Sequence, residues 1–459
     1  MTYPETIKYL EFFVNYEKIP VYPYKESLKL ERIKEFLNII GNPQGGLKCI
    51  HIAGTKGKGS TCAFISYILR ESGYKVGLYT SPHLSDFKER IRIISPKTEN
   101  QKQTTDFEGM ISADDLADLV AGLKPSIEKY NRVSKYGPLS FFEVYTALAF
   151  VYFKEQKVDF AVLETGLGGR LDATNVASPL VCAITSISYE HTQKLGNTLR
   201  EIATEKAGII KTNPKSLPTG QAGQIPNPKF IVISAPQEEE ARDVIRKKCQ
   251  EVGARLYEVG KDIAYKKTKN GFSIKGIFDE YASLEIKLLG RHQLINATVA
   301  VGVVEALRFF DINVDMDSIR SGLYNTCWPG RCEVISREPL VLLDGAQNIA
   351  SSKALKEAIK ENFKYKKLIL VLGISNDKDI RGICNELYEL ADEVILTKTN
   401  NLRATEPEIL AQYFIPKAVC ITSNVEEARN LAYHIAKEED LILVCGSLFV
   451  VGEFRNVKV

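Results

Sequence analysis

Short apolar runs rich in β-branched residues alternate with helix-length amphipathic segments along the whole chain, and this alternation narrows the choice of fold more than any other feature. The runs in the first part of the chain lie at 49–53, 76–80, 160–165, 181–187 and 230–234. Those in the last part lie at 341–344, 368–373, 393–397, 419–423 and 441–446. Such alternation is typical of parallel sheets wrapped by helices. The sequence therefore predicts two successive α/β units.

The change from the first unit to the second is expected between Asp311 and Glu333. This region holds the only tryptophan and a WPGR turn, Trp328 to Arg331. We therefore divide the chain into an N-terminal domain over 1–327 and a C-terminal domain over 328–459.

A departure from the pattern occurs between Ile263 and Leu289, where shorter alternating runs surround Asn270-Gly271. An Asn-Gly pair between such runs is a strong hairpin signal. We expect a small antiparallel excursion there, followed by a helix over 293–309. Two segments with little apolar content, 96–109 and 214–228, are predicted to be surface loops.

The stretch HIAGTKGKGS at 51–60 carries the clearest chemical signal. Its glycines let the backbone approach phosphate oxygens, Lys58 neutralises their charge, and Ser60 offers a hydroxyl to phosphate or magnesium. The loop is shorter than the full Walker pattern, because Ile52 stands where that pattern has its first glycine. A tight turn without a ligand is the alternative, but the apolar strand before the loop and the apolar helix after it favour nucleotide binding.

Composition narrows the class of protein further. The chain has 459 residues, of which 44% are hydrophobic and 25% charged, as in ordinary globular proteins. Sixty basic and 57 acidic side chains give a net charge of +3, too balanced for nucleic acid to be the main partner. Nine cysteines without a CxxC pair, and no apolar run of membrane-spanning length, predict a reduced cytoplasmic protein that binds no membrane.

Polar side chains follow several of the predicted strands, where ligands of parallel sheets bind. Ser81 follows the run at 76–80, Glu164 ends the run at 160–165, and His191 follows the run at 181–187. Lys206 lies at the end of the next predicted helix. Each alone could be structural, as a cap, a buried ion pair or a solvated charge. Together they form an inventory suited to holding magnesium against a triphosphate.

Ten ordered segments point to one family. They are LERIKEFLNIIGNPQ, HIAGTKGKGS, TSPHL with ERIRI, SFFEVYTALAF, LETGLGGRLDATN, SISYEHTQKLGNTLREIATEKAGIIK, GRHQLINATVAV, WPGRCEV, LDGAQN and CGSLFVVGEFR. With them the chain resembles, over nearly its whole length, folylpolyglutamate synthase and dihydrofolate synthase of the Mur ligase superfamily. The resemblance implies an N-terminal P-loop ATPase domain with a mostly parallel sheet and a C-terminal Rossmann-like α/β domain. It also implies an ATP-dependent ligase that joins L-glutamate to a folate or to dihydropteroate.

The resemblance further implies a nucleotide site and two magnesium ions. The positions that match nucleotide-holding residues are Gly54, Thr55, Gly57, Lys58, Gly59, Ser60, Asn296, Arg331 and Asp344. Ser81 and Glu164 match ligands of one magnesium, and His191 matches a ligand of the second. Lys206 matches a lysine that is often carbamylated in this superfamily, which would turn a repelled cation into an anionic ligand. Lys58, Lys206 and His191 are the candidate catalytic residues.

The substrate positions follow from the same resemblance. Phe142, Asp172 and Asn175 match the region expected to hold the pterin end of the acceptor. Ser447 matches a position linked to glutamate binding, and Gln347 stands near the expected glutamate and acyl phosphate. A monomer is expected from the family alone.

Three departures from the family pattern concern this site. Gln347 replaces the usual histidine of DGAHN, so that a hydrogen bond remains possible there but titration does not. Lys56 replaces the usual asparagine of the phosphate loop, and Phe449 stands where many members have tyrosine. Two alternatives therefore stay open: a Mur-type ligase for another carboxylate acceptor, and a catalytically inactive ATP-binding homologue.

Overall fold

The computed structural model describes residues 1–19, 22–96, 106–211, 230–269 and 271–456. The described chain forms two compact units. Unit 1 comprises Met1–His83, Phe87–Lys287 and Gln293–Thr326. Unit 2 comprises Cys327–Val459 together with the short segments Leu84–Asp86 and Leu288–His292, which sequence reasoning left in the first domain.

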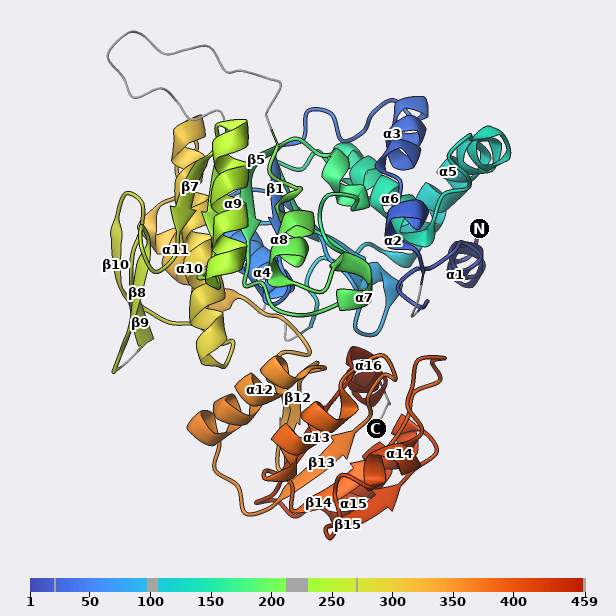
Figure 1. Cartoon of the computed structure of the whole chain (residues 1–459), viewed down its shortest axis with the longest axis vertical. Helices are drawn as coiled ribbons and strands as arrows, with labels where there is room; N and C mark the ends of the chain where they lie inside the picture. The colour runs from blue at the N-terminus through green and yellow to red at the C-terminus, as the bar shows by residue number, and fades with distance from the viewer. Residues whose placement is uncertain (20–21, 97–105, 212–229, 270, 457–459) are drawn as a thin grey trace. The chain divides into compact units, whose positions relative to one another are not determined.

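Unit 1 contains both helices and strands, in mixed order along the chain (Figure 1). Its strands are β1 (Cys49–Ala53), β2 (Val76–Tyr79), β3 (Ile91–Ile94), β4 (Phe160–Glu164), β5 (Pro179–Ile184), β6 (Ile231–Ser234), β7 (Arg255–Glu258), β8 (Ala264–Thr268), β9 (Gly271–Lys275) and β10 (Glu280–Leu284). Its helices are α1 (Tyr3–Glu11), α2 (Tyr24–Ser27), α3 (Leu30–Ile39), α4 (Lys58–Glu71), α5 (Ala113–Val133), α6 (Phe141–Glu155), α7 (Thr192–Leu195), α8 (Leu199–Ala207), α9 (Glu239–Val252), α10 (Arg291–Ala306) and α11 (Met316–Asn325). Short 3₁₀ turns are η1 (Phe87–Arg90), η2 (Ala173–Val176) and η3 (Leu307–Phe310).

A seven-stranded sheet forms the centre of unit 1, in the order β3-β2-β4-β1-β5-β6-β7. All its pairs are parallel except β2 with β3. Every residue of β1 and β4 is buried, which requires cover on both faces of the sheet. The mostly parallel fold predicted for this unit is confirmed. Sequence reasoning missed β3 and β7, which are four-residue strands at the two edges of the sheet. β7 is only half buried, whereas β3 is mostly buried and has Arg92 within its apolar run.

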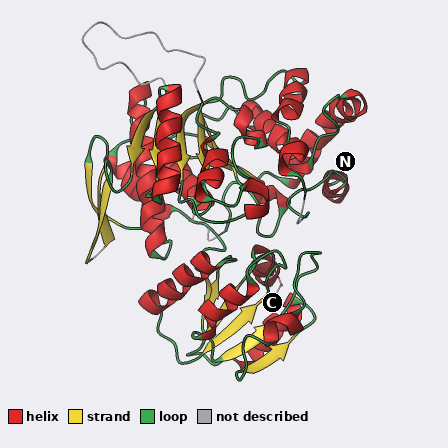
Figure 2. Ribbon diagram, in the orientation of Figure 1, coloured by secondary structure: helices red, strands yellow, loops and turns green. Residues whose placement is uncertain are grey.

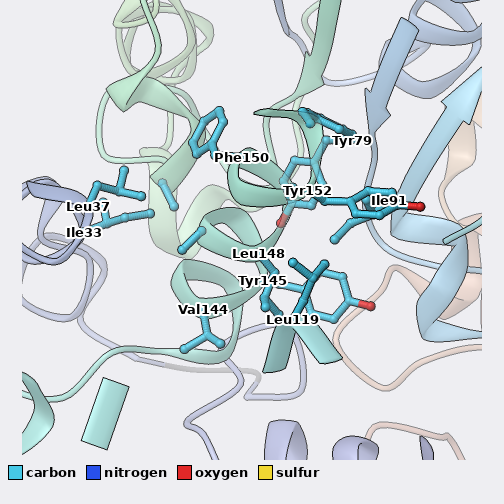
Figure 3. Packing of buried hydrophobic residues seen from close by; sticks show 14 of the residues in the cluster. Ile33, Leu37, Tyr79, Ile91, Leu119, Val144, Tyr145, Leu148, Phe150 and Tyr152 are labelled. Carbon is cyan, nitrogen blue, oxygen red and sulfur yellow. The ribbon is translucent and has the colours of Figure 1, made fainter. Parts of the chain in front are cut away.

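The main hydrophobic core of unit 1 lies around α6. Side chains from α3, α5, β2 and β3 converge on this helix, as Figure 3 shows for Ile33, Leu119, Tyr79 and Ile91. A capping box starts α6, in which Ser140 and Glu143 satisfy each other's backbone amides. Packing in this core therefore holds α6 in place, together with the ends of the loops that adjoin this helix.

The antiparallel excursion predicted between Ile263 and Leu289 is confirmed as a three-stranded sheet, β10-β9-β8. Its first hairpin pairs Thr268 with Gly271, and Asn270 lies outside the described residues. The predicted loop at 214–228, and residues 97–105 of the other, also lie outside them.

A six-stranded sheet forms the centre of unit 2, in the order β11-β12-β16-β13-β14-β15, with helices around it (Figure 2). Only β11 runs antiparallel to its neighbour. Its strands are β11 (Glu333–Arg337), β12 (Leu340–Leu343), β13 (Leu368–Leu372), β14 (Glu393–Leu396), β15 (Ala418–Ile421) and β16 (Leu441–Cys445). Its helices are α12 (Ile349–Asn362), α13 (Ile380–Tyr388), α14 (Pro407–Ala411), α15 (Val425–Ile435) and α16 (Leu448–Asn456). Five of these strands coincide with the predicted apolar runs.

One helical stretch, Arg291–Phe310, is long and apolar enough to cross a membrane by length and composition, which corrects the expectation that no run reaches that length. Most of this stretch is buried inside the protein, as in a core helix. The nine cysteines are free thiols, and seven of them are buried.

Candidate active site

The predicted site residues of unit 1 gather at the carboxyl ends of four neighbouring strands. The strands β2, β4, β1 and β5 are adjacent and parallel, so their carboxyl ends meet at one edge of the sheet. Ser81 follows β2, Glu164 ends β4, the phosphate loop follows β1, and the segment that leads to His191 follows β5. This edge is where ligands of open parallel sheets bind.

The phosphate loop enters α4 through Gly57, which has a left-handed backbone (φ +84°). A Cβ at this glycine would lie 2.1 Å from Oδ1 of Asn296, so the amide of Asn296 lies directly against the loop. In the described chain no side chain caps the first amides of α4. These amides, the helix dipole and Lys58 together suit a phosphate group.

The loop is anchored to the segment that follows β5. The amides of Thr55 and Lys56 donate to the Ser186 carbonyl at 3.0 and 3.1 Å, and the Thr55 hydroxyl bonds to the backbone of Ser188. The ammonium of Lys56 lies 3.0 Å from the Glu190 carboxylate. Lys56, the departure from the family pattern, thus has an acidic partner in this chain.

Glu164 is buried and lies between two other predicted site residues. Its carboxylate is 3.7 Å from the ammonium of Lys58 and accepts a hydrogen bond from the Ser81 amide at 3.2 Å. Among the described residues, no three His, Cys, Asp or Glu side chains gather into a metal-binding group. One carboxylate beside a serine nonetheless fits magnesium, which takes one or two protein oxygens and completes its shell with water and phosphates.

His191 belongs to the segment that follows β5 at the same edge of the sheet, but its backbone conformation is unusual. It has a left-handed backbone (φ 53°) at the start of α7 and follows Glu190. Ser81 and Glu164 are in contact in the structure, whereas the role of His191 as a ligand of the second magnesium remains a prediction.

Lys206 is buried at the end of α8, and its ammonium donates to the Gly54 carbonyl at 2.8 Å. Burial, together with the nearby charge of Lys58, lowers the pKa of Lys206 to about 7. The amine is therefore largely neutral slightly above pH 7. A neutral amine is the form that can react with carbon dioxide.

The residues predicted to hold the pterin end of the acceptor lie in the loop after β4 or pack against it. Asp172 is buried and accepts hydrogen bonds from the amides of Leu167 and Thr174. The amide of Asn175 donates to two backbone carbonyls, one of them that of Gly208 after α8. The ring of Phe142 lies against this loop at Gly166, where a Cβ would be 2.7 Å from it.

The predicted residues of unit 2 gather at the carboxyl ends of β12 and β16. Asp344 accepts from the amides of Cys332 and Ala346, both at 2.8 Å. The Gly446 amide donates to the Ala346 carbonyl, which joins the two strand ends. The other predicted residues of this edge are Arg331, Gln347 and Ser447.

Two residues near the predicted sites went unnoticed in the sequence. Gln293 Oε1 accepts a hydrogen bond from the side-chain amide of Asn296 at 2.9 Å, and Oδ1 of Asn296 faces Gly57 of the phosphate loop. His292 is exposed in the first turn of α10, where desolvation of the imidazole lowers its pKa and the charges of Asp344 and Arg331 act on it in opposite directions. Both lie one helical turn before Asn296. Residues three or four positions apart share a helix face, so this spacing from a predicted site residue could have identified them.

Comparisons with known proteins identify the family of this chain. Residues 139–304 match the Mur ligase middle domain, and residues 330–448 match the Mur ligase glutamate ligase domain. The chain is 33% identical to a dihydrofolate synthase/folylpolyglutamate synthase of Bacillus subtilis, over 93% of this chain and 94% of that protein. It is 36% identical to a probable bifunctional folylpolyglutamate synthase/dihydropteroate synthase of Haloferax volcanii, over 99% of this chain but only 50% of that protein. The chain thus spans about half the length of this relative.

Solved structures are similar over the whole chain. Folylpolyglutamate synthase of Mycobacterium tuberculosis, complexed with ADP and AMPPCP, aligns with a TM-score of 0.82 at 30% identity, over 95% of this chain and 96% of that one. FolC of Escherichia coli in complex with DHPP and ADP aligns with a TM-score of 0.81 at 29% identity, over 100% of this chain and 97% of that one.

Proposed function

Because this chain belongs to the folylpolyglutamate synthase and dihydrofolate synthase family of the Mur ligase superfamily, we propose that it is an ATP-dependent ligase. It joins the amine of L-glutamate to a carboxylate of dihydropteroate, of a reduced folate, or of both, and releases ADP and phosphate. The observation that carries this proposal is the cluster of Lys58, Glu164, Ser81 and Lys206 around the phosphate loop.

The first chemical step is transfer of the γ-phosphoryl group of ATP to the acceptor carboxylate, which gives an acyl phosphate. Gly57 and Gly59 let the loop approach the phosphates, and Lys58 offsets their charge. Asn296, held against Gly57, is suited to contact the nucleotide as well. Positioning and charge compensation supply most of the rate enhancement in such transfers.

Magnesium would be held by Ser81 and Glu164, with His191 as a candidate ligand of a second ion. When bound, it supplies positive charge that offsets the repulsion between the triphosphate and the acceptor carboxylate. Carbamylation of Lys206 is part of the proposal, because its lowered pKa leaves a neutral amine available near neutral pH.

The second step is attack of the neutral glutamate amine on the acyl phosphate, after which phosphate leaves and an amide remains. We assign Gln347 and Ser447 to the glutamate side and Phe142, Asp172 and Asn175 to the acceptor side. Gln347 can orient glutamate by hydrogen bonding but cannot accept its proton, so another base must do so. We place the reaction in the cytoplasm, in a monomer.

Substitution of Lys58 or Glu164 tests the proposal. Lys58→Ala and Glu164→Ala are each expected to reduce glutamate-dependent phosphate release by at least about 100-fold, because Lys58 offsets the charge of the phosphates and Glu164 would hold the magnesium that does the same. Lys154→Ala, an exposed lysine of α6, is the matched control and should leave the rate unchanged. Circular dichroism and thermal unfolding establish that the variants fold. Wild-type rates in folded Lys58→Ala and Glu164→Ala proteins would contradict the assignment.

A further inference from the structure

A buried chain of hydrogen bonds joins β1 to the loop that follows β4. His51 is fully buried in β1, and its Nε2 lies 2.8 Å from Oγ1 of Thr174. The Thr174 hydroxyl lies 2.5 Å from Oδ1 of Asp172. Asp172 also accepts from the amides of Thr174 and Leu167, at 3.0 and 2.9 Å. The chain therefore runs from His51 through Thr174 and Asp172 into the loop 166–175.

The direction of these bonds follows from the protons that each group carries. Asp172 receives amide protons on both oxygens, as a carboxylate does, and the Thr174 hydroxyl gives its single proton to this carboxylate. Thr174 Oγ1 can then only accept from His51, so the imidazole proton lies on Nε2. Nδ1 of His51 has no hydrogen-bond partner among the described residues. A lone pair left without a partner costs less than a buried N–H would.

The surroundings of His51 keep its imidazole neutral. Burial lowers the pKa of His51 to about 3, and the charge of Lys211 contributes in the same direction. The ammonium of Lys211 donates to the carbonyls of Asn175 and Ala177, which closely follow Thr174 in the chain. His51 and Lys211 thus hold the C-terminal end of the loop, and the bond from the Leu167 amide to Asp172 ties its first part to that end.

We propose that His51 is a positioning residue for the acceptor substrate: its Nε2–H orients Thr174, and Thr174 orients the carboxylate of Asp172 and the loop 166–175. The inference rests on the proposed function, because this loop carries Asp172 and Asn175, which we assign to the acceptor. The strand β1 that carries His51 continues directly into the phosphate loop. One strand therefore sets the position of both the nucleotide loop and the acceptor loop.

Steady-state kinetics of two variants test this role. His51→Phe keeps a ring but removes the donor, and Thr174→Val keeps the shape but removes the hydroxyl. Each is expected to raise the KM for the acceptor about tenfold, the loss of roughly one hydrogen bond, while kcat and the KM for ATP stay within about twofold. His51→Gln, which retains a donor, should return the acceptor KM to within about threefold of wild type. Thr6→Val, which removes another fully buried hydroxyl in α1, is the control and should leave the acceptor KM unchanged.

An unchanged acceptor KM in folded Thr174→Val overturns the inference, even if His51→Phe fails to fold. Nitrogen-15 NMR of histidine-labelled wild-type protein at pH 7 supplies a readout that does not depend on turnover. The His51 signals, identified by their absence from His51→Gln, should report a proton on Nε2 and a lone pair on Nδ1. A proton on Nδ1 overturns the inference. A wild-type protein that turns over neither acceptor contradicts the proposed function instead, and the NMR result still decides the direction of the hydrogen bonds.

Discussion

At the scale of single residues, Lys206 places an amine in a buried part of unit 1, where its positive charge is costly. The ordinary pKa of 10.5 applies in the unfolded chain, and burial lowers it to about 7 in the folded state. Below pH 7 both states hold the proton, and the folded state bears the full cost of a buried ammonium. That cost declines as the pH rises from 7 toward 10.5, so the contribution of Lys206 to stability rises over this window.

Lys206→Met is therefore expected to raise the free energy of unfolding by about 2 kcal/mol at pH 6.5, and by much less at pH 9.5. Urea unfolding in carbonate-free buffer measures both values. Lys154→Met, an exposed control, should give the same difference at both pH values. An equal gain at pH 6.5 and pH 9.5 for Lys206→Met would exclude a buried ammonium at this position.

The sequence alone identifies some of the site residues and not others. The glycines of the phosphate loop have a recognisable spacing, and Asn296 and Glu164 follow from a family resemblance. His51 and Thr174 have no such signal, because a histidine in an apolar strand and a threonine in a turn are common. Their pairing joins residues 123 positions apart. The pairing of β1 with β4 and β5, between which Thr174 lies, brings them together.

At the scale of elements, two glycines with similar backbones flank α4. Gly57 (φ +84°) precedes the helix and contacts Asn296. Gly73 (φ +87°) follows the helix, and a Cβ added there would have no neighbouring atom within 4 Å. Gly57→Ala is expected to weaken ATP binding at least about 100-fold, because the added methyl group displaces Asn296 and deforms the loop. Gly73→Ala should cost about 1 kcal/mol of stability and leave ATP binding unchanged. Isothermal titration calorimetry with a nonhydrolysable ATP analogue measures the affinities, and equal affinities in the two variants would contradict the role of Gly57.

A buried ion pair joins α3 to α6, beside the predicted acceptor residue Phe142. Nε of Arg32 lies 2.8 Å from the Glu143 carboxylate, and both side chains are only 6% exposed. Arg32→Met is expected to cost about 3 kcal/mol in urea unfolding, because it leaves a buried carboxylate without its partner.

The double variant Arg32→Met/Glu143→Gln should recover part of this loss, since the unpaired charge is removed. The exposed pair Lys124–Glu128 is the control, and Lys124→Met should change stability by less than about 0.5 kcal/mol. A double variant less stable than Arg32→Met would show that the cost does not come from the unpaired charge.

The elements themselves were largely predictable. Five strands of unit 1 and five of unit 2 coincide with apolar runs. Nine of these ten strands are largely buried, and a strand buried on both faces must be apolar throughout, whereas the tenth, β15, is a mostly exposed edge strand. The strands that sequence reasoning missed, β3, β7 and β11, lie at sheet edges. The apolar pattern is weak in β7 and β11, which are only partly buried, whereas β3 is mostly buried and carries Arg92 within its apolar run.

At the scale of the whole molecule, the account assigns one reaction to the chain: glutamate ligation driven by ATP. The two α/β units and the family follow from sequence motifs in a fixed order. The choice between dihydropteroate and a reduced folate does not follow from these motifs, because it depends on the shape of the acceptor site and not on the residues that bind the phosphates.

The most direct test measures phosphate release and product mass together. Purified protein is incubated with ATP, magnesium and L-glutamate, with dihydropteroate in one reaction and a reduced folate in another. The account predicts that at least one acceptor gains glutamyl units, with one phosphate released for each unit added. Product from one acceptor alone identifies a dedicated enzyme, and product from both identifies a bifunctional one. A folded protein that binds ATP but adds glutamate to neither acceptor would contradict the account.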